Sequence, residues 1–138
     1  MRACEFWKKQ SDPAGKALTV TLESTGTATC LLLPTGQLIF DIAAAAVNKY
    51  LSVIIPFQSR VIGASIIHGN ATSSNVALQT AAAAAITDAM APSTDDKKVK
   101  YADTIDDTYS ALAEDAVLKL AITTGAFTGI VIVELQPY

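Results

Sequence analysis

The sequence predicts an all-β fold, a β-sandwich for which jelly-roll connectivity is one option, with one or two short helices. Three observations support this prediction. Apolar residues recur either at every second position or in short β-branched runs, as they do in strands. Gly, Pro, Asn and Ser separate these runs at intervals of about ten residues, a spacing typical of sandwiches. The chain lacks the regular alternation of strands with long helices that would indicate a parallel sheet.

The first sixteen residues predict a flexible N-terminal arm, and residues 17–138 predict a single sandwich domain. The arm has four basic and two acidic residues and includes the turn-prone segment 11–15. The arm contains two adjacent aromatic residues, Phe6 and Trp7, and it is costly to leave such side chains exposed to water. They can anchor the arm to a partner or fold back onto the protein's own core, and both alternatives stay open. We expect the interface residues of the arm to be Arg2, Phe6, Trp7, Lys8 and Lys9.

The first half of the domain reads as strands connected by tight turns. Alternating or β-branched apolar residues predict strands at residues 18–22, 30–33, 37–40, 50–55 and 60–67. The turn-forming segment 34–36 joins two of them and predicts a hairpin. Asp41 precedes an alanine run at 43–46, which predicts a short helix, because Asp caps helix starts and alanine has the highest helix propensity.

The second half predicts further strands around a solvated segment. Alternation around Val76 and Leu78 predicts a strand at residues 73–80, and apolar runs predict strands at residues 117–123 and 129–135. The last of these alternates little, which predicts a central, buried strand. We expect a second short helix at residues 86–90, which Pro92 ends, and a single helical turn at 104–107 that Thr104 caps.

The distribution of charge is uneven and bears on function. Residues 17–87 contain only four Lys, Arg, Asp or Glu side chains, those of Glu23, Asp41, Lys49 and Arg60. Because a free soluble domain normally carries charges over its whole exposed surface, this segment predicts surfaces that neighbouring subunits cover. The charges that return from Asp88 onward mark a solvated face. The net charge of −3 disfavours nucleic-acid binding, and no apolar run is long enough to span a membrane. Residues 1–10 carry four charged side chains where a signal peptide would need an apolar run.

The chain offers little for catalysis or for metal binding, so we expect no enzyme activity, no metal and no cofactor. His68 is its only histidine, and nucleophilic catalysis would need it to have a partner that the sequence does not reveal. Cys4 and Cys30 could pair, but two cysteines define no disulfide framework. The acidic residues of segment 103–107 lack the glycine and the terminal glutamate of a calcium-binding loop.

The order of motifs from Val61 onward carries a resemblance to a known class of proteins. The motifs are the run 61–67, the polar strand 76–79, the segment 85–90, the strand 98–100 before Thr104-Ile105-Asp106-Asp107, and the final runs 117–120 and 129–133. In this order the chain resembles small virion structural proteins of tailed bacteriophages, of the capsid decoration (cement) type. The resemblance covers about the C-terminal three fifths of the 138 residues.

This resemblance implies a binding role without turnover. A cement protein binds and stabilises the shell of the major capsid protein, often as a trimer, and lies on the exterior of the virion after synthesis in the host cytoplasm. The charge-poor segment fits this role, since a subunit that clamps capsid proteins needs extended surfaces of low charge. A tail, neck or fibre component of the virion stays an alternative. A carbohydrate-binding β-sandwich, with exposed aromatic residues on one face or a calcium site, is another, and a small hydrolase that uses His68 is a third.

Overall fold

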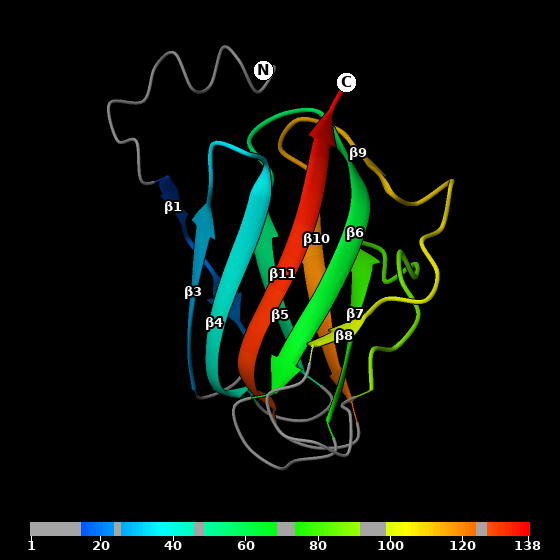
Figure 1. Ribbon diagram of the computed structural model, residues 1–138. Helices are drawn as coiled ribbons and strands as arrows, with labels where there is room; N and C mark the ends of the chain where they lie inside the picture. Colours follow the sequence, from blue (N-terminus) through cyan, green and yellow to red (C-terminus); the bar gives the residue numbers. More distant parts are fainter. Residues whose placement is uncertain (1–14, 24–25, 46–48, 69–73, 92–98, 124–126) are drawn as a thin grey trace.

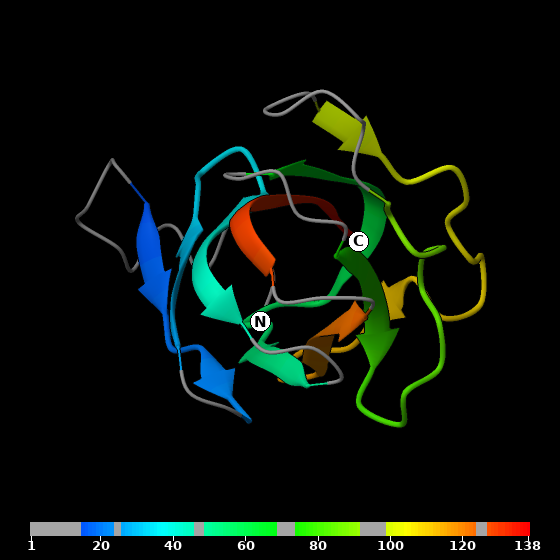
Figure 2. The ribbon, with the colours of Figure 1, turned by 90° about the horizontal axis from the view of Figure 1, so that it is seen from below.

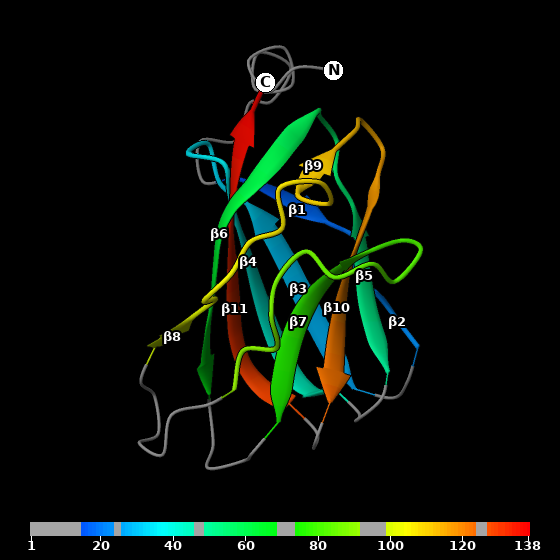
Figure 3. The ribbon, with the colours of Figure 1, turned by 90° about the vertical axis from the view of Figure 1, so that its right-hand side faces the viewer.

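The computed structural model describes residues 15–23, 26–45, 49–68, 74–91, 99–123 and 127–138, and it confirms the predicted all-β sandwich. Two antiparallel sheets, one of seven strands and one of four, form its layers (Figure 1). Seen along the strands, both sheets curl around a common core (Figure 2). From the side the sheets lie face to face, with β6 and β11 in one layer and β5 and β10 in the other (Figure 3).

Each sheet has an order that differs from the order along the chain. The larger sheet runs β1-β3-β4-β11-β6-β8, and β9 pairs with another part of β6. Its strands are β1 (Lys16–Leu18), β3 (Thr27–Leu32), β4 (Gln37–Ala45), β6 (Ser59–His68), β8 (Val99–Tyr101), β9 (Ala111–Leu112) and β11 (Phe127–Pro137). The smaller sheet runs β2-β5-β10-β7. Its strands are β2 (Thr21–Leu22), β5 (Tyr50–Ile54), β7 (Asn75–Thr80) and β10 (Val117–Thr123).

The pairing of these strands is that of a jelly roll. β4 pairs with β11, β5 with β10, β6 with β9, and β7 with the segment 85–90 through isolated bridges. These pairs are nested, so the chain is equivalent to one long antiparallel hairpin that is rolled into two layers. Consecutive strands from β4 to β7 therefore alternate between the sheets. β11 lies between β4 and β6, which confirms the central position predicted for the last strand.

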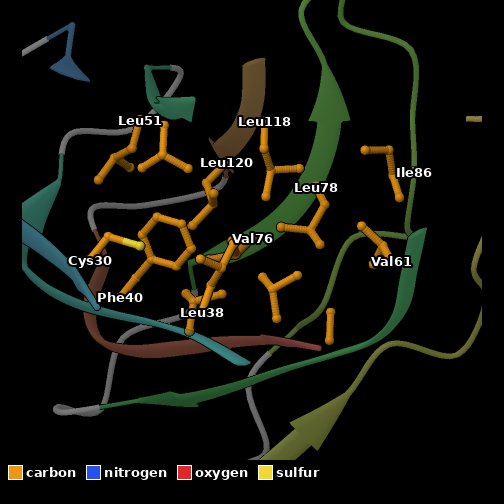
Figure 4. Packing of buried hydrophobic residues seen from close by; sticks show 14 of the residues in the cluster. Cys30, Leu38, Phe40, Leu51, Val61, Val76, Leu78, Ile86, Leu118 and Leu120 are labelled. Carbon is orange, nitrogen blue, oxygen red and sulfur yellow. The ribbon is translucent and has the colours of Figure 1, made fainter. Parts of the chain in front are cut away.

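Alternate residues of the facing strands build one core between the sheets. In β11, for example, Val131 is fully buried, while Ile130 and Ile132 point to the opposite face of the sheet. Figure 4 shows Cys30 beside Phe40, its partner across the β3–β4 ladder, within this core. Burial of a large apolar side chain contributes about 1.5–3 kcal/mol, so the shared core holds the two layers together.

The predicted hairpin is confirmed as β3 and β4, which pair from Leu32 and Leu38 onward. Gly36 in its turn has a φ of 91°, a conformation that residues with side chains rarely adopt. A Cβ atom at Gly36 would lie 2.6 Å from the carbonyl oxygen of Leu135 in β11. The turn therefore needs glycine both for its backbone conformation and for its close approach to β11.

The short helices expected at residues 43–46 and 86–90 are wrong for the residues that the structure describes. β4 continues through Ala43 and Ala45 in its pairing with β3 and β11, so sheet pairing overrides the helix propensity of alanine. Segment 85–90 is extended along β7 instead. The Thr87 hydroxyl holds it there by accepting a hydrogen bond of 3.0 Å from the backbone N–H of Leu78.

Two other predicted elements are displaced. The turn expected at 104–107 lies further along the chain, and Asp106 rather than Thr104 caps it. Its Oδ1 accepts hydrogen bonds from the backbone N–H groups of Thr108 and Tyr109 at 2.8 and 2.7 Å. The strand expected at 18–22 is divided because the chain crosses between the sheets there, so β1 pairs with β3 and β2 pairs with β5.

Candidate partner-binding face

The outward face of the larger sheet carries an uncharged row of residues across its whole width. Residues that are paired across an antiparallel ladder point to the same side of the sheet. From β1 to β8, the row consists of Ala17, Leu31, Ile39, Ile132, Ser65 and Tyr101. Leu31, Ile39 and Ile132 alternate with buried residues of their own strands, so their side chains point away from the core.

A second row lies beside the first, two residues away along β11. From β3 to β8, it consists of Thr29, Asp41, Ile130, Ile67 and Val99. We call the large apolar members of the two rows the apolar band, which comprises Leu31, Ile39, Ile67, Val99, Tyr101, Ile130 and Ile132. It lies on the side of the larger sheet that faces the viewer in Figure 1. With neighbouring strands about 4.8 Å apart, the band is roughly 19 Å wide from β3 to β8.

The band is open to solvent at β8. Val99 is 43% exposed and Tyr101 is 67% exposed. A shallow groove of about 120 Å³ joins the band there, with walls that include Gly63, Ile105 and Ile132. Small-molecule sites usually have about 300–1,000 Å³, so the groove is better suited to one side chain of a protein partner than to a whole ligand.

The outward face of the smaller sheet has a different character. Its corresponding row consists of Thr21, Ser52, Lys119 and Gln79. The Nζ atom of Lys119 lies 4.9 Å from the centre of the Tyr50 ring, so a cation covers the aromatic residue of this face. Polar side chains of this kind can stay in water, whereas large apolar patches on a soluble protein mark sites of interaction. Among its described residues, the smaller sheet also exposes one large apolar side chain, that of Ile54 at 57%, but only the larger sheet carries large apolar side chains across five strands.

Carboxylates border the apolar band. Asp41 stands in the second row, and Glu134 follows Ile132 two residues later along β11. The Nε2 atom of Gln37 donates a hydrogen bond of 3.5 Å to Oε1 of Glu134. The Glu134 carboxylate also covers Gly63, where an added Cβ atom would meet its Oε2 at 2.8 Å. The face thus has an apolar centre with a partly negative rim.

A larger pocket, of about 440 Å³, lies where the chain crosses between the sheets. Its lining residues are Leu18, Thr19, Thr21, Ser52, Val53, Ile54 and Val117. None of these side chains is ionisable, so the pocket holds no general acid, base or charged nucleophile. We find no support for catalysis in it.

Burial makes the one cysteine among the described residues unreactive. Cys30 is free and only 2% exposed. Burial raises the pKa of its thiol from 9.0 to about 12, because a thiolate would lose its hydration in the core. The thiol therefore stays protonated at neutral pH and is a poor nucleophile. Cys4, the other half of the disulfide considered above, lies outside the described residues.

Three of the acidic residues around segment 103–107 have structural roles. Oδ1 of Asp88 accepts hydrogen bonds from the backbone N–H groups of Asp103 and Thr104 at 2.9 and 3.0 Å. Asp103 also forms an ion pair of 3.2 Å with Lys100, and Asp106 caps the next turn. Within the described ranges, no group of three His, Cys, Asp or Glu side chains could hold a metal ion.

The candidate residues from the sequence and the apolar band do not overlap. Arg2, Phe6, Trp7, Lys8 and Lys9 lie outside the described residues. His68 ends β6 opposite Gly129. Sequence reasoning missed the band, although a signal for it exists: the runs 61–67 and 129–133 have hardly any polar residues. The run 129–133 predicts a central, buried strand, whereas one face of β11 is outward and carries Ile130 and Ile132.

No protein family, no curated protein and no solved structure matches this chain. In the part of the chain that the structure describes, no helix is long and apolar enough to cross a membrane.

Proposed function

We propose that this protein is a capsid decoration (cement) protein, which binds and stabilises the shell formed by the major capsid protein of a tailed bacteriophage. The apolar band is the observation that carries the proposal. Apolar side chains that extend across five neighbouring strands, with carboxylates at their border, are suited to bind a protein surface. We infer that this face docks onto the major capsid protein.

The jelly-roll pairing supports the proposal by analogy. Viral capsid proteins use this fold repeatedly, but lectins and cupins share it, so the fold alone does not decide the function. The fold supplies rigidity, because strand pairing on both sides of β11 holds the central part of the apolar band on a rigid sheet. Each docked subunit would add interface area that must be broken before capsid subunits separate, which opposes the pressure of the packaged genome.

The assembly that we propose is a homotrimer on the exterior of the virion, at points of threefold symmetry in the shell. Closed rotational symmetry lets every subunit of the trimer make the same contact with the shell. In the particle-bound form, the residues that we place against a neighbouring subunit are Arg2, Phe6, Trp7, Lys8 and Lys9.

Binding to purified shells of the major capsid protein tests the proposal. Ile132→Lys puts an ammonium group in the middle of the band, and an unpaired buried charge costs about 3–5 kcal/mol. Because about 1.4 kcal/mol corresponds to tenfold in affinity, we expect the affinity for shells, measured by co-sedimentation, to fall more than about tenfold.

Thr123→Lys is the matched control, because Thr123 is exposed and faces outward on β10 of the smaller sheet. We expect this variant to bind shells as the wild type does. Equal binding of the two variants would show that the apolar band does not contact the shell. A wild-type protein that does not bind shells at all would contradict the proposed function.

A carbohydrate-binding role has one specific observation in its favour. Tyr101 is well exposed beside the groove at β8, and amphipathic aromatic side chains are suited to contact ligands that are partly polar. A glycan array with the wild type and with Tyr101→Ala separates the two functions. Glycan binding that depends on Tyr101 would favour this second candidate, and a wild type that binds no glycan would exclude it.

A further inference from the structure

We propose that, in the free subunit, residues 1–14 of the same chain lie across the apolar band and cover it. The inference concerns the protein before it docks, so it does not depend on which partner the band binds. Three observations support it: the place where the described chain begins, the length of the segment before that place, and the side chains that this segment carries.

The described chain begins beside the band. Gly15 is buried and directly precedes β1, the edge strand that pairs with β3. A Cβ atom on Gly15 would lie 3.3 Å from the Cγ and Cδ1 atoms of Leu31, whose side chain is the first member of the band. The segment that precedes Gly15 is therefore tethered at one end of the apolar band.

This segment is long enough to cross the band. Trp7 lies eight residues before Gly15, and an extended chain spans about 3.3 Å per residue, so their separation can reach roughly 26 Å. Ile132 lies only two strands beyond Leu31, a distance of about 10 Å across the sheet. A short tether also gives its end an effective concentration near the millimolar range. A second copy of the chain would have to compete with this local occupant.

The side chains of the segment complement those of the band. Phe6 and Trp7 are two large apolar side chains in direct succession, and two lysines follow them. The aromatic rings would remove apolar surface from water on both sides of the contact. The lysines would lie near the carboxylates of Asp41 and Glu134, which border the band. On a particle, the capsid protein would displace the segment and release it toward a neighbouring subunit.

Tryptophan fluorescence tests this inference, because Trp7 is the only tryptophan of the chain. In the free wild-type protein we expect emission at a shorter wavelength than in the urea-unfolded chain, together with weaker quenching by acrylamide. Ile132→Lys should shift the emission toward that of the unfolded chain and strengthen the quenching. The circular dichroism spectrum should stay that of a β-protein.

Thr123→Lys again serves as the matched control and should leave the emission and the quenching unchanged. Ile132→Thr keeps a β-branched side chain in the strand, so it provides a milder variant in case Ile132→Lys does not fold. We expect it to cause a smaller shift in the same direction. Both effects should be the same above and below the concentration at which the proposed trimer dissociates, because the occupant belongs to the same chain.

Three results would overturn the inference. Wild-type emission equal to that of the unfolded chain would place Trp7 in water. Shielded emission that neither Ile132 variant changes would place Trp7 on a different surface. Shielding that disappears on dilution, together with a loss of mass in light scattering, would assign the cover to a second copy. None of these results would affect the proposed capsid function, which shell binding measures separately.

Discussion

Alkaline pH should destabilise this protein through Cys30. The pKa of its thiol is about 12 in the folded protein, against an ordinary value of 9.0. Below pH 9 the thiol is protonated in both states, so it adds no pH dependence. As the pH rises from 9 toward 12, the unfolded chain ionises while the folded chain does not, and stability is lost. The difference between 12 and 9.0, at about 1.36 kcal/mol per pH unit, gives a total loss of about 4 kcal/mol.

Cys30→Ala separates this effect from the other groups that titrate at alkaline pH. Loss of the sulfur atom beside Phe40 should cost about 1 kcal/mol at every pH. At pH 11, ionisation of the thiol in the unfolded chain should already lower the free energy of unfolding of the wild type by about 2.7 kcal/mol. The wild type should therefore be more stable than the variant at pH 7, and the variant should be more stable at pH 11 by roughly 1.7 kcal/mol.

Urea unfolding in the presence of a reducing agent, followed by circular dichroism from pH 7 to pH 11, measures this difference. The two stability curves should cross near pH 10, at about the point where the ionisation loss equals the packing loss. A difference in the free energy of unfolding that stays constant over this range would contradict the raised pKa of Cys30. The thiol would then ionise equally in the folded and unfolded states, and its burial would be disproved.

Three further predictions concern the scaffold and its assembly. Gly36→Ala should lower the free energy of unfolding by about 2–3 kcal/mol because of its positive φ and the close Leu135 carbonyl. Gly63→Ala should cost less than about 1 kcal/mol, since the tip of the Glu134 side chain can move; equal losses in urea unfolding would contradict this account. Asp106→Ala should lower the free energy of unfolding by about 1 kcal/mol, because it removes the cap of the following turn. Asp107→Ala should lower it by less than about 0.5 kcal/mol. The reverse order in thermal unfolding would argue against the role of Asp106 as a cap. Light scattering of the free protein should give the mass of three chains, and a monomer at micromolar concentration would exclude the trimer.

The strands were predictable because their signal is local. Alternation or β-branching is visible in the segments that form β3, β4, β5, β6, β10 and β11, and the turn at 34–36 fixes the hairpin. The helices expected at residues 43–46 and 86–90 were wrong because they were predicted from propensity alone. Asp41 and the alanines that follow it favour a helix in isolation, but β4 has a paired strand on each side, and pairing decides the outcome.

The apolar band and the jelly-roll pairing were beyond local reasoning. Nested pairing joins residues that are far apart in the chain, such as Ile39 and Ile132, and no local pattern specifies which strands meet. An apolar run such as 129–133 also has the same appearance whether both of its faces are buried or one is outward. The register of five strands was needed to show that Leu31, Ile39, Ile132 and Tyr101 share one outward row.

Cryo-electron microscopy of intact virus particles, at a resolution that traces strands, would show whether this face docks on the capsid. We expect density for this jelly roll on the capsid, with the outward face of the larger sheet, and Ile39 and Ile132 in particular, buried against another protein chain. Particles in which this face points into solvent, or from which the protein is absent, would disprove the proposed docking.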